Sequence, residues 1–426
     1  MVPQPDDRIR KARGSFAAMA GAYALGTFND NFFKQAVMLL AVTLGRKDLQ
    51  GHAGIAFTLP FVLFAAPAGW VADRFPKRGV VLGAKLLELA AALVGAFGLL
   101  TGHLGLMVGM VGLMGLQATF FSPALNGSIP ELFPAGYVTR ANALLRVVVT
   151  AGILVGISLS GFILDLPGTP LLGASRGRAV LALCVVGVAL LGLVVSLGIP
   201  RRPAADPARP FPRRGPLDTL AELGRIWRDR QLGRVLAADV FVWSAGVFQL
   251  LVINTLGKEQ FRLTDTGTSL LVASQLVGMA LGGLLAGRLA SGPRWQRVLP
   301  PAGFGMALSM GAVAGAPFLP PPAQVPSLYL LVGLGGLFGG LFLIPCESFL
   351  QIRPAPERKG AVWAAANCAA FLGMAAASLL YIPLKGLKPS LAYGGLGAAA
   401  MAFTLWLALE LRREAWRALS APPPGA

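Results

Sequence analysis

Charged residues, histidines and cysteines are scarce in this sequence of 426 residues, which has 2 His and 3 Cys. Charged residues make up 13%, about half the share found in an ordinary soluble domain. Cys184, Cys346 and Cys368 all fall inside apolar runs, so we expect packing residues and not a disulfide framework or a metal site. Neither His52 nor His103 has an acidic residue at the spacing of a local catalytic dyad. The sequence therefore predicts neither an enzyme nor a resident cofactor.

Apolar residues dominate the chain instead. They make up 55% of the residues, and the mean hydropathy is +0.66. Runs of about 20 apolar residues, the length that crosses a bilayer as a helix, recur along the sequence. The fold class is predicted to be an all-α membrane protein with twelve transmembrane helices in two six-helix halves. The predicted spans are 15–43, 51–72, 79–101, 104–125, 140–164, 179–199, 234–256, 267–289, 298–318, 327–349, 360–382 and 390–411.

The longest connection between predicted spans lies at the middle of the chain and is rich in proline and arginine. It divides the sequence into an N-terminal half (1–199), a basic cytoplasmic linker (200–233), a C-terminal half (234–411) and a cytoplasmic tail (412–426). Within the linker, 217–234 is predicted to form a short basic helix. Two halves of six spans are typical of a transporter that works by alternating access.

The net charge of +18 would suggest nucleic acid as a partner of a soluble protein. Here, most of the 37 Lys and Arg residues fall in loops on one side of the membrane if the N-terminus is cytoplasmic. We therefore expect a multi-pass protein with both termini in the cytoplasm, its basic linker against anionic headgroups, and no nucleic-acid partner. Cleavage of a signal peptide near Ala24 is disfavoured, because apolar sequence resumes after Asn31.

A basic turn follows the second predicted span and is echoed after the eighth. The first copy reads Gly69-x-x-x-Asp73-Arg74-Phe75-Pro76-Lys77-Arg78, and the second reads Gly283-x-x-x-Gly287-Arg288. A charged cluster at a helix end can latch one side of two helix bundles. The first copy resembles the loop 2–3 signature of the major facilitator superfamily, with Pro76 in place of a glycine. The residues to which we assign a gate role are Gly69, Asp73, Arg74, Lys77, Arg78, Arg140, Arg288 and Glu347.

A narrower resemblance lies in the first span. The stretch Gly26-Thr27-Phe28-Asn29-Asp30-Asn31-Phe32-Phe33-Lys34 is similar to the first helix of the bacterial lysophospholipid transporter family. Phe121-Ser122-Pro123-Ala124 and Trp243-Ser244-Ala245-Gly246-Val247 are also similar. The sequence departs from the family at Leu125 and at Gln249-Leu250, where the family has cations that could hold a phosphate.

This resemblance implies a flippase of the bacterial inner membrane that moves lysophospholipids from the outer to the inner leaflet. It also implies a supporting role for a separate acyltransferase or acyl ligase that re-esterifies the product. Because the sequence ends at residue 426, we expect no fused enzyme domain. A monomer is the usual state in the superfamily.

Ionisable residues inside predicted spans are the main candidates for a substrate site, because burying them unpaired is costly. Asp30 and Lys34 lie one helical turn apart, so they share a face that could bind a zwitterionic headgroup. Asn29 and Asn31 would add neutral hydrogen bonds. The competing interpretation of Asp30 and Lys34 is a structural ion pair.

The other candidates are more evenly balanced. Lys85 and Glu88, three residues apart, could form an ion pair that satisfies both charges or could be part of the site. Arg146 could grip a phosphate or gate the cytoplasmic side. The full set of predicted substrate-binding residues is Asn29, Asp30, Asn31, Lys34, Lys85, Glu88, Arg146, Trp243 and Gln249.

The second half is far more apolar than the first. An amphiphilic substrate suits this asymmetry, with its headgroup on the polar half and its acyl chain on the apolar half. The alternative function is a proton-coupled drug or metabolite exporter of the same superfamily, in which Asp30 or Glu88 would carry the proton.

Overall fold

The computed structural model describes the backbone of residues 5–126, 128, 132–133, 135–208, 210–290, 295–355 and 358–420. Twelve long helices make up the bundle in this part of the chain. The first group is α1 (Pro5–Thr43), α2 (Asp48–Arg74), α3 (Lys77–Thr101), α4 (Leu104–Asn126), α6 (Ala135–Leu164) and α7 (Arg176–Ser196). The second group is α9 (Arg230–Thr255), α10 (Asp265–Leu289), α11 (Leu299–Val313), α12 (Pro321–Ile352), α13 (Lys359–Leu384) and α14 (Pro389–Ser420).

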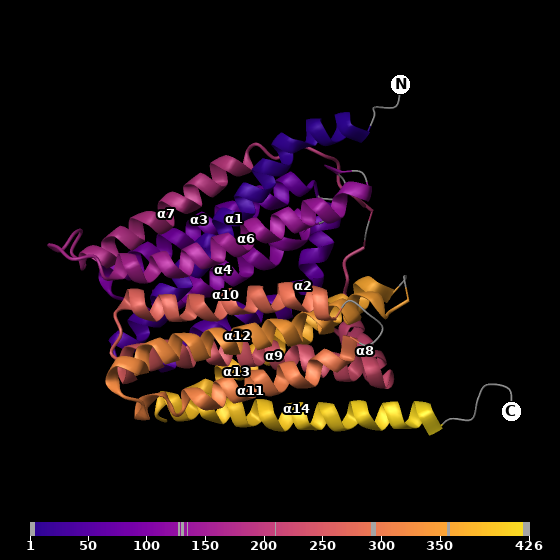
Figure 1. Ribbon diagram of the computed structural model, residues 1–426. Helices are drawn as coiled ribbons and strands as arrows, with labels where there is room; N and C mark the ends of the chain where they lie inside the picture. Colours follow the sequence, from indigo (N-terminus) through magenta and orange to yellow (C-terminus); the bar gives the residue numbers. More distant parts are fainter. Residues whose placement is uncertain are drawn as a thin grey trace.

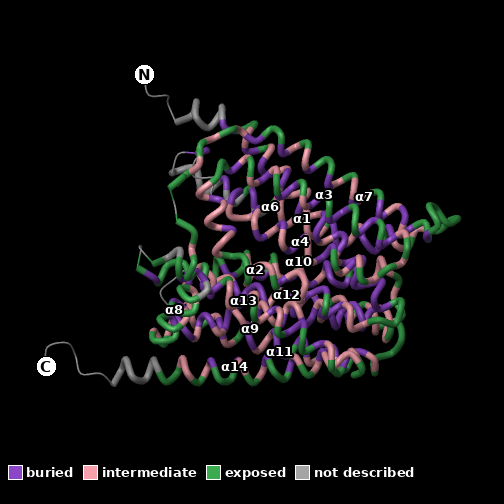
Figure 2. The backbone as a smooth tube through the Cα atoms, turned by 180° about the vertical axis from the view of Figure 1, so that it is seen from behind, coloured by how far each residue is buried: buried purple, intermediate pink, exposed green. Residues whose placement is uncertain are grey.

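The lengths and composition of these helices agree with a membrane protein. Among the described residues, 9 helices are long and apolar enough to cross a bilayer, and a tenth span is formed by the two segments of α2. Of the remaining two, α11 has 15 residues, and α1 carries the polar cluster around Asp30. Leucines such as Leu183 on α7 and Leu405 on α14 are exposed. Figure 2 shows exposed residues along α7 and α14 at the outside of the bundle, where lipid tails would cover them. The prediction of an all-α membrane protein is confirmed.

The two groups of helices lie side by side, with a short crossing helix at one end (Figure 1). Across the boundary between the groups, α2 packs against α13 and α6 packs against α10. The short helix is α8 (Gly215–Arg228), which packs on α13 and α9. Helix α1 begins and α14 ends at this same end, which we call the terminal end; the other is the opposite end (Figure 1).

The connection between the groups differs in detail from the sequence prediction. The basic helix predicted over 217–234 is divided at Asp229, where α8 ends and α9 begins. The Asp229 carboxylate accepts hydrogen bonds from the backbone N–H groups of Gln231 and Leu232. Asp229 therefore caps α9, as aspartate commonly does at a helix start.

Glycines let two helices of the second group touch through their backbones. A Cβ atom at Gly282 of α10 would collide with the carbonyl oxygen of Leu337 in α12, and one at Gly340 of α12 would collide with the carbonyl oxygen of Met279. Small residues permit this close approach in membrane helices, where packing and not hydrophobicity drives association. The glycine-rich run 333–340 is thus part of a backbone-to-backbone seam.

Helix α2 is sharply bent. Its segments Asp48–Leu63 and Ala65–Arg74 meet at 55°. Pro67 lies in the second segment and has no N–H to donate to the carbonyl of Leu63, so the helical hydrogen bond is lost where the bend occurs. The bend gives the two ends of α2 different neighbours, which matters for the cavity beside it.

Candidate functional site

A cavity of about 690 Å³ lies between the two groups of helices, on the terminal side of the bundle's middle. Its volume is typical of small-molecule sites. It is lined from α1, α2 and α4 of the first group and from α13 of the second. The lining residues are Tyr23, Gly26, Thr27, Asp30, Phe61, Ala65, Gln117, Ala118, Thr119, Phe121, Ser122, Pro123, Trp363, Ala364, Asn367, Cys368 and Phe371.

One wall of the cavity is polar and charged. Asp30 contributes a carboxylate that is 9% exposed, and its Oδ1 atom has no hydrogen-bond partner among the described residues. Thr27 lies one turn earlier on α1, and its carbonyl accepts a hydrogen bond of 2.8 Å from Asn31. Gln117 of α4 completes this wall. The wall can therefore offer an anionic acceptor together with neutral donors.

Aromatic rings also line the cavity. Phe61 of α2 and Phe371 of α13 stack with ring centroids 4.1 Å apart and planes within 5° of parallel. Trp363 lies two turns from Phe371 on α13 and lines the same cavity. A cavity that contains both a carboxylate and aromatic rings can hold the two ends of an amphiphilic molecule. The apolar wall comes from both groups, so the predicted division of polar and apolar surface by half is too simple.

Lys34, which the sequence paired with Asp30, lies with its ammonium 4.1 Å from the centroid of the Phe57 ring. This is the distance of a cation–π contact. Lys34 also attracts the Asp30 carboxylate electrostatically, as does Lys85. The structure thus brings Asp30, Lys34 and Lys85 into one charged neighbourhood, in which Asp30 lines the cavity.

Lys85 and Glu88 form a fully buried ion pair on α3, with 2.6 Å between Lys85 Nζ and Glu88 Oε2. Gln117 donates a hydrogen bond of 3.4 Å to the same Glu88 oxygen. Lys85 Nζ also lies 4.9 Å from the centroid of the Phe121 ring. Both Gln117 and Phe121 line the cavity, so the ion pair lies directly behind the polar wall.

Several predicted site residues point elsewhere. Asn29 is buried and donates to the carbonyl of Val185 in α7, away from the cavity. Gln249 joins helices of the second group by donating to the Tyr393 hydroxyl and accepting from Gln275. Trp243 packs against the apolar core of that group. The side chains of Arg140 and Arg146, on α6, lie outside the described residues.

The predicted gate loop after α2 is in contact with the connection to the second group. The Asp73 carbonyl accepts a hydrogen bond from the Asp206 backbone N–H, and Trp70 packs edge-on against Phe211. Arg78 donates to the carbonyl of Leu197, just after α7.

The other predicted gate residues are scattered. Arg74 lies 5.8 Å from the Trp70 ring, and Lys77 is buried. Among the described residues, no atom beyond the chain neighbours of Gly69 and its own helix backbone would lie within 4 Å of a Cβ there. Arg288 is exposed on α10, and Glu347 of α12 interacts electrostatically with Asp239 of α9.

A set of buried polar residues at the opposite end was missed by sequence reasoning. Gln35 of α1 donates to Asn254 of α9 at 2.9 Å and to Ser269 of α10 at 3.3 Å. Gln50 of α2 donates to the Tyr381 hydroxyl of α13 at 2.8 Å and to Thr255 of α9 at 3.2 Å. These bonds join the two groups of helices directly. The residues that form this amide seam are Gln35, Gln50, Asn254, Thr255, Ser269 and Tyr381.

Charged contacts surround the amide seam. Lys47 pairs with Glu259 at 2.7 Å, and Lys385 pairs with Asp48 at 3.3 Å. The Asp165 carboxylate, just after α6, accepts hydrogen bonds from the first backbone N–H groups of α10. Burial raises the pKa of Asp165, but these hydrogen bonds outweigh it and hold the pKa below its ordinary value. These contacts hold the two groups of helices together between the cavity and the opposite end.

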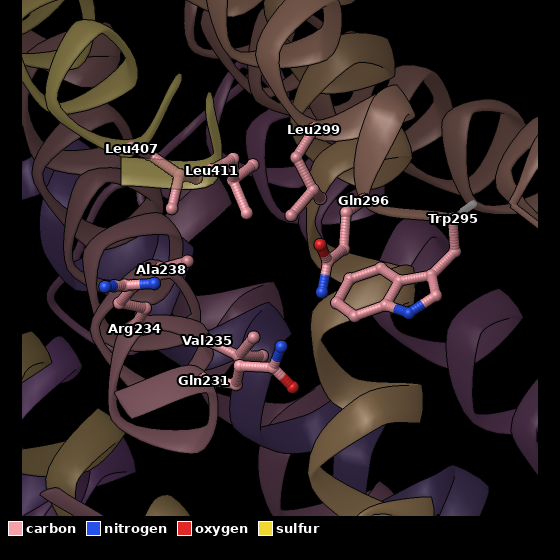
Figure 3. Close-up of a pocket in the computed structure, with 9 residues that line it drawn as sticks. All are labelled: Gln231, Arg234, Val235, Ala238, Trp295, Gln296, Leu299, Leu407 and Leu411. Carbon is pink, nitrogen blue, oxygen red and sulfur yellow. The ribbon is translucent and has the colours of Figure 1, made fainter. Parts of the chain in front are cut away.

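A second, much smaller cavity lies in the second group, between α9, α14 and the start of α11. Figure 3 shows Gln231, Arg234, Trp295 and Leu411 around it. Its volume of about 10 Å³ is the space of one water molecule. It cannot hold an organic substrate.

Comparisons with known proteins agree with this architecture. The family model described as Major Facilitator Superfamily matches residues 14–378. The lysophospholipid transporter LplT of Serratia proteamaculans (strain 568) is 30% identical over 358 residues, covering 82% of each chain. The protein of the same name from Yersinia pestis (strain Pestoides F) is 28% identical over 350 residues, covering 80% of this chain and 79% of its own.

Solved structures show the same fold. A D-xylose–proton symporter aligns with a TM-score of 0.66 at 20% identity, covering 91% of this chain and 96% of its own. A bacterial homologue of the human lysosomal transporter Spinster, in an inward-facing and unoccupied conformation, aligns with a TM-score of 0.69 at 16% identity, covering 93% and 94%. At these identities the likeness extends to the fold alone. From the family match and the twelve-helix bundle, the chain belongs to the major facilitator superfamily of transporters.

Proposed function

We propose that this chain transports lysophospholipids by alternating access. The observation that carries the proposal is a cavity lined both by the Asp30 carboxylate and by the stacked rings of Phe61 and Phe371. A lysophospholipid has the matching form, with a polar headgroup at one end of a single acyl chain. Relatives at about 30% identity that bear the name lysophospholipid transporter support the same substrate class.

The proposed direction, from the outer to the inner leaflet, is the one that the family resemblance of the first span implies. With both termini in the cytoplasm, the opposite end faces the outside, and the cavity lies on the cytoplasmic side of the amide seam. The described conformation is then inward-facing, the one that releases substrate toward the inner leaflet. Opening the amide seam while the gate loop latches the terminal end would admit substrate from the outer leaflet.

Within this proposal Asp30 binds the cationic or hydroxylated part of the headgroup, and Lys34 attracts its phosphate. The bacterial inner membrane is the proposed location, the chain acts as a monomer, and a separate acyltransferase or acyl ligase consumes the product. The gate loop 69–78 closes the cytoplasmic side in the outward-facing state.

Uptake of labelled lysophosphatidylethanolamine into proteoliposomes tests the proposal. The unmodified chain is expected to take up the lipid, and Asp30→Asn is expected to reduce uptake to the level of empty liposomes, because the variant loses the charge in the cavity. Asp218→Asn, which changes an exposed carboxylate on α8, is the matched control and should transport normally.

Two results would contradict the proposal. Normal uptake by Asp30→Asn would remove the headgroup role. Absence of uptake by the folded, unmodified chain would favour the proton-coupled exporter, and efflux of a small drug driven by an imposed pH gradient would then support that function.

A further inference from the structure

One apolar side of α8 faces away from the bundle. Leu217, Leu220 and Trp227 are 63%, 60% and 57% exposed. Successive members are three and seven residues apart, so they share one side of the helix. Ile226 and Glu222 lie on the other side, where both are buried, and Ile226 belongs to the apolar core of the second group. Packing on the bundle therefore uses one side of α8 and leaves an apolar side exposed.

The position of α8 suits the surface of a bilayer. With 14 residues, α8 is too short to cross a membrane, and it lies across the terminal end of the bundle (Figure 1). A contiguous apolar patch is unusual on a surface that contacts only water. Leucine and tryptophan on one side of a short helix are typical of helices that lie flat at the boundary between headgroups and acyl chains.

Arginines flank the apolar side of α8. Arg213 and Arg214 precede the helix, Arg228 and Arg230 lie at its other end, and all four side chains are exposed. Among the described residues, no carboxylate forms an ion pair with any of these four arginines. The two ends of α8 therefore carry positive charge that the described part of the protein does not neutralise.

The acidic residues of α8 do not cancel this charge. Glu222 pairs with Arg358 at 2.6 Å and with Arg225 at 2.9 Å. Asp218 is the other carboxylate on the helix and is exposed. Anionic headgroups above acyl chains match both the positive charge and the apolar side. A second copy of the same surface would instead bring like charges together, which disfavours a contact between two copies.

We propose that α8 is an anchor for anionic lipid, in which Leu217, Leu220 and Trp227 insert between acyl chains and the four flanking arginines bind lipid phosphates. The linker then contacts the membrane by apolar insertion as well as by charge, with its apolar side about 5–10 Å into the boundary region. The anchor is separate from the cavity and does not depend on which molecule is transported. Since Glu222 ties α8 to Arg358, the anchor holds the start of α13 at the membrane surface.

Fluorescence of Trp227 in the full-length chain tests the insertion. The chain has 7 Trp, so the Trp227 signal is the difference between the unmodified chain and Trp227→Leu, both in nanodiscs of phosphatidylglycerol and phosphatidylcholine. Lipids brominated near the top of the acyl chains should reduce this signal at least about twofold, because an inserted ring lies at that depth. Trp406, which is 42% exposed within a predicted span of α14, gives the matched positive control through Trp406→Leu.

Two results would overturn the anchor. Quenching of the Trp227 signal by acrylamide in the aqueous phase, without quenching by brominated lipid, would place the apolar side in water. Protection from both quenchers would place it against another protein surface, such as a second copy of this chain.

Amide hydrogen exchange across α8 tests the role of charge. Replacing phosphatidylglycerol with phosphatidylcholine should speed exchange in 215–228 several-fold in the unmodified chain. The effect should be less than about twofold in Arg213→Gln/Arg214→Gln, which loses half of the flanking charge. The matched control is Arg176→Gln/Arg178→Gln at the opposite end, which removes the same charge and should respond as the unmodified chain does. Exchange that is independent of lipid charge in the unmodified chain would contradict binding of anionic lipid.

Discussion

At the opposite end of the bundle the two groups of helices touch through buried amides and hydroxyls, whereas at the terminal end a cavity separates them and a linker helix joins them. The amide seam places polar groups of α1 and α2 directly on α9, α10 and α13. At the terminal end, α8 is fastened to α13 by a hydrogen bond of 2.6 Å from Arg358 to Glu222. Opening of the opposite end would therefore break the amide seam, whereas the hydrogen bond between Arg358 and Glu222 would remain.

The strongest test of this comparison is a wedge at the opposite end. Any side chain at Gly51 places a Cβ 2.7 Å from the Ser378 carbonyl oxygen, so Gly51→Leu should force α2 and α13 apart. Cys368 lines the cavity and should then react at least about tenfold faster with a membrane-impermeant thiol reagent added from the opposite side. This factor corresponds to a shift of about 1.4 kcal/mol toward the conformation that is open at the opposite end.

Mass spectrometry of the Cys368 peptide measures the modification. The control is Gly109→Leu on α4, where no described atom beyond the local helix backbone lies within 4 Å of the added Cβ, and it should leave the labelling unchanged. Unchanged labelling in Gly51→Leu would show that the contact between α2 and α13 does not close the opposite end.

A smaller effect is expected from the seam itself. Gln35→Leu removes the amide that donates to both Asn254 and Ser269, and so leaves the buried Asn254 oxygen without this donor. The conformation that is closed at the opposite end should lose about 1–2 kcal/mol of stability relative to the open one. The rate of Cys368 labelling from that side should rise with the population of the open conformation. Gln324→Leu, whose amide bonds only within the loop before α12, is a control at the same end. Equal labelling of the two variants would show that the amide seam does not help to close the opposite end.

At the terminal end, Glu222→Gln should loosen α8 without opening the opposite end. Burial raises the pKa of Glu222, but hydrogen bonds from Arg358 and Arg225 outweigh it and lower the pKa below 4.5. The stabilisation is therefore complete above the ordinary pKa and is lost as pH falls through the lowered one. Amide hydrogen exchange across α8 should become several-fold faster in the variant, a change of about 1 kcal/mol. A rise in Cys368 labelling from the opposite side would contradict the separation of the two ends.

The smallest effect is expected at Asp165, which caps α10 across the boundary between the groups. Asp165→Asn should weaken the closed state by about 0.5 kcal/mol, because the carboxylate is largely exposed and screened. With a lowered pKa, the contribution of Asp165 is present above its ordinary pKa of 3.8 and disappears as pH falls below it. Asp165→Asn should therefore speed amide hydrogen exchange in the first turn of α10 at neutral pH, and this difference from the unmodified chain should vanish in acid.

The sequence identified Asp30 because a carboxylate in an apolar run has few places to lie except a cavity. Its neighbour Asn29 shows the limit of that argument. One residue along a helix turns the side chain by about 100°, and Asn29 faces the Val185 carbonyl instead. Apolar run lengths predicted the all-α fold, since they depend only on local composition.

The amide seam could not be predicted in the same way. Gln35 and Asn254 are 219 residues apart, and Gln50 and Tyr381 are 331 apart. The partner of each residue depends on which helices adjoin and at what rotation, and neither can be read from a single helix. The cavity wall has the same dependence, because Phe61 and Phe371 meet only when α2 lies on α13.

The backbone contact between α10 and α12 has a consequence for how this protein can vary. At Gly282 and Gly340 even the smallest side chain would strike a main-chain carbonyl, and no neighbouring rotamer can relieve that collision. A saturation mutagenesis library selected for folded protein should be nearly empty of substitutions at these two positions. Open glycines such as Gly246 and Gly311, in the same half, should accept alanine. Substitutions that persist in this half should therefore occur at surfaces that face lipid or the cavity, and not at Gly282 or Gly340.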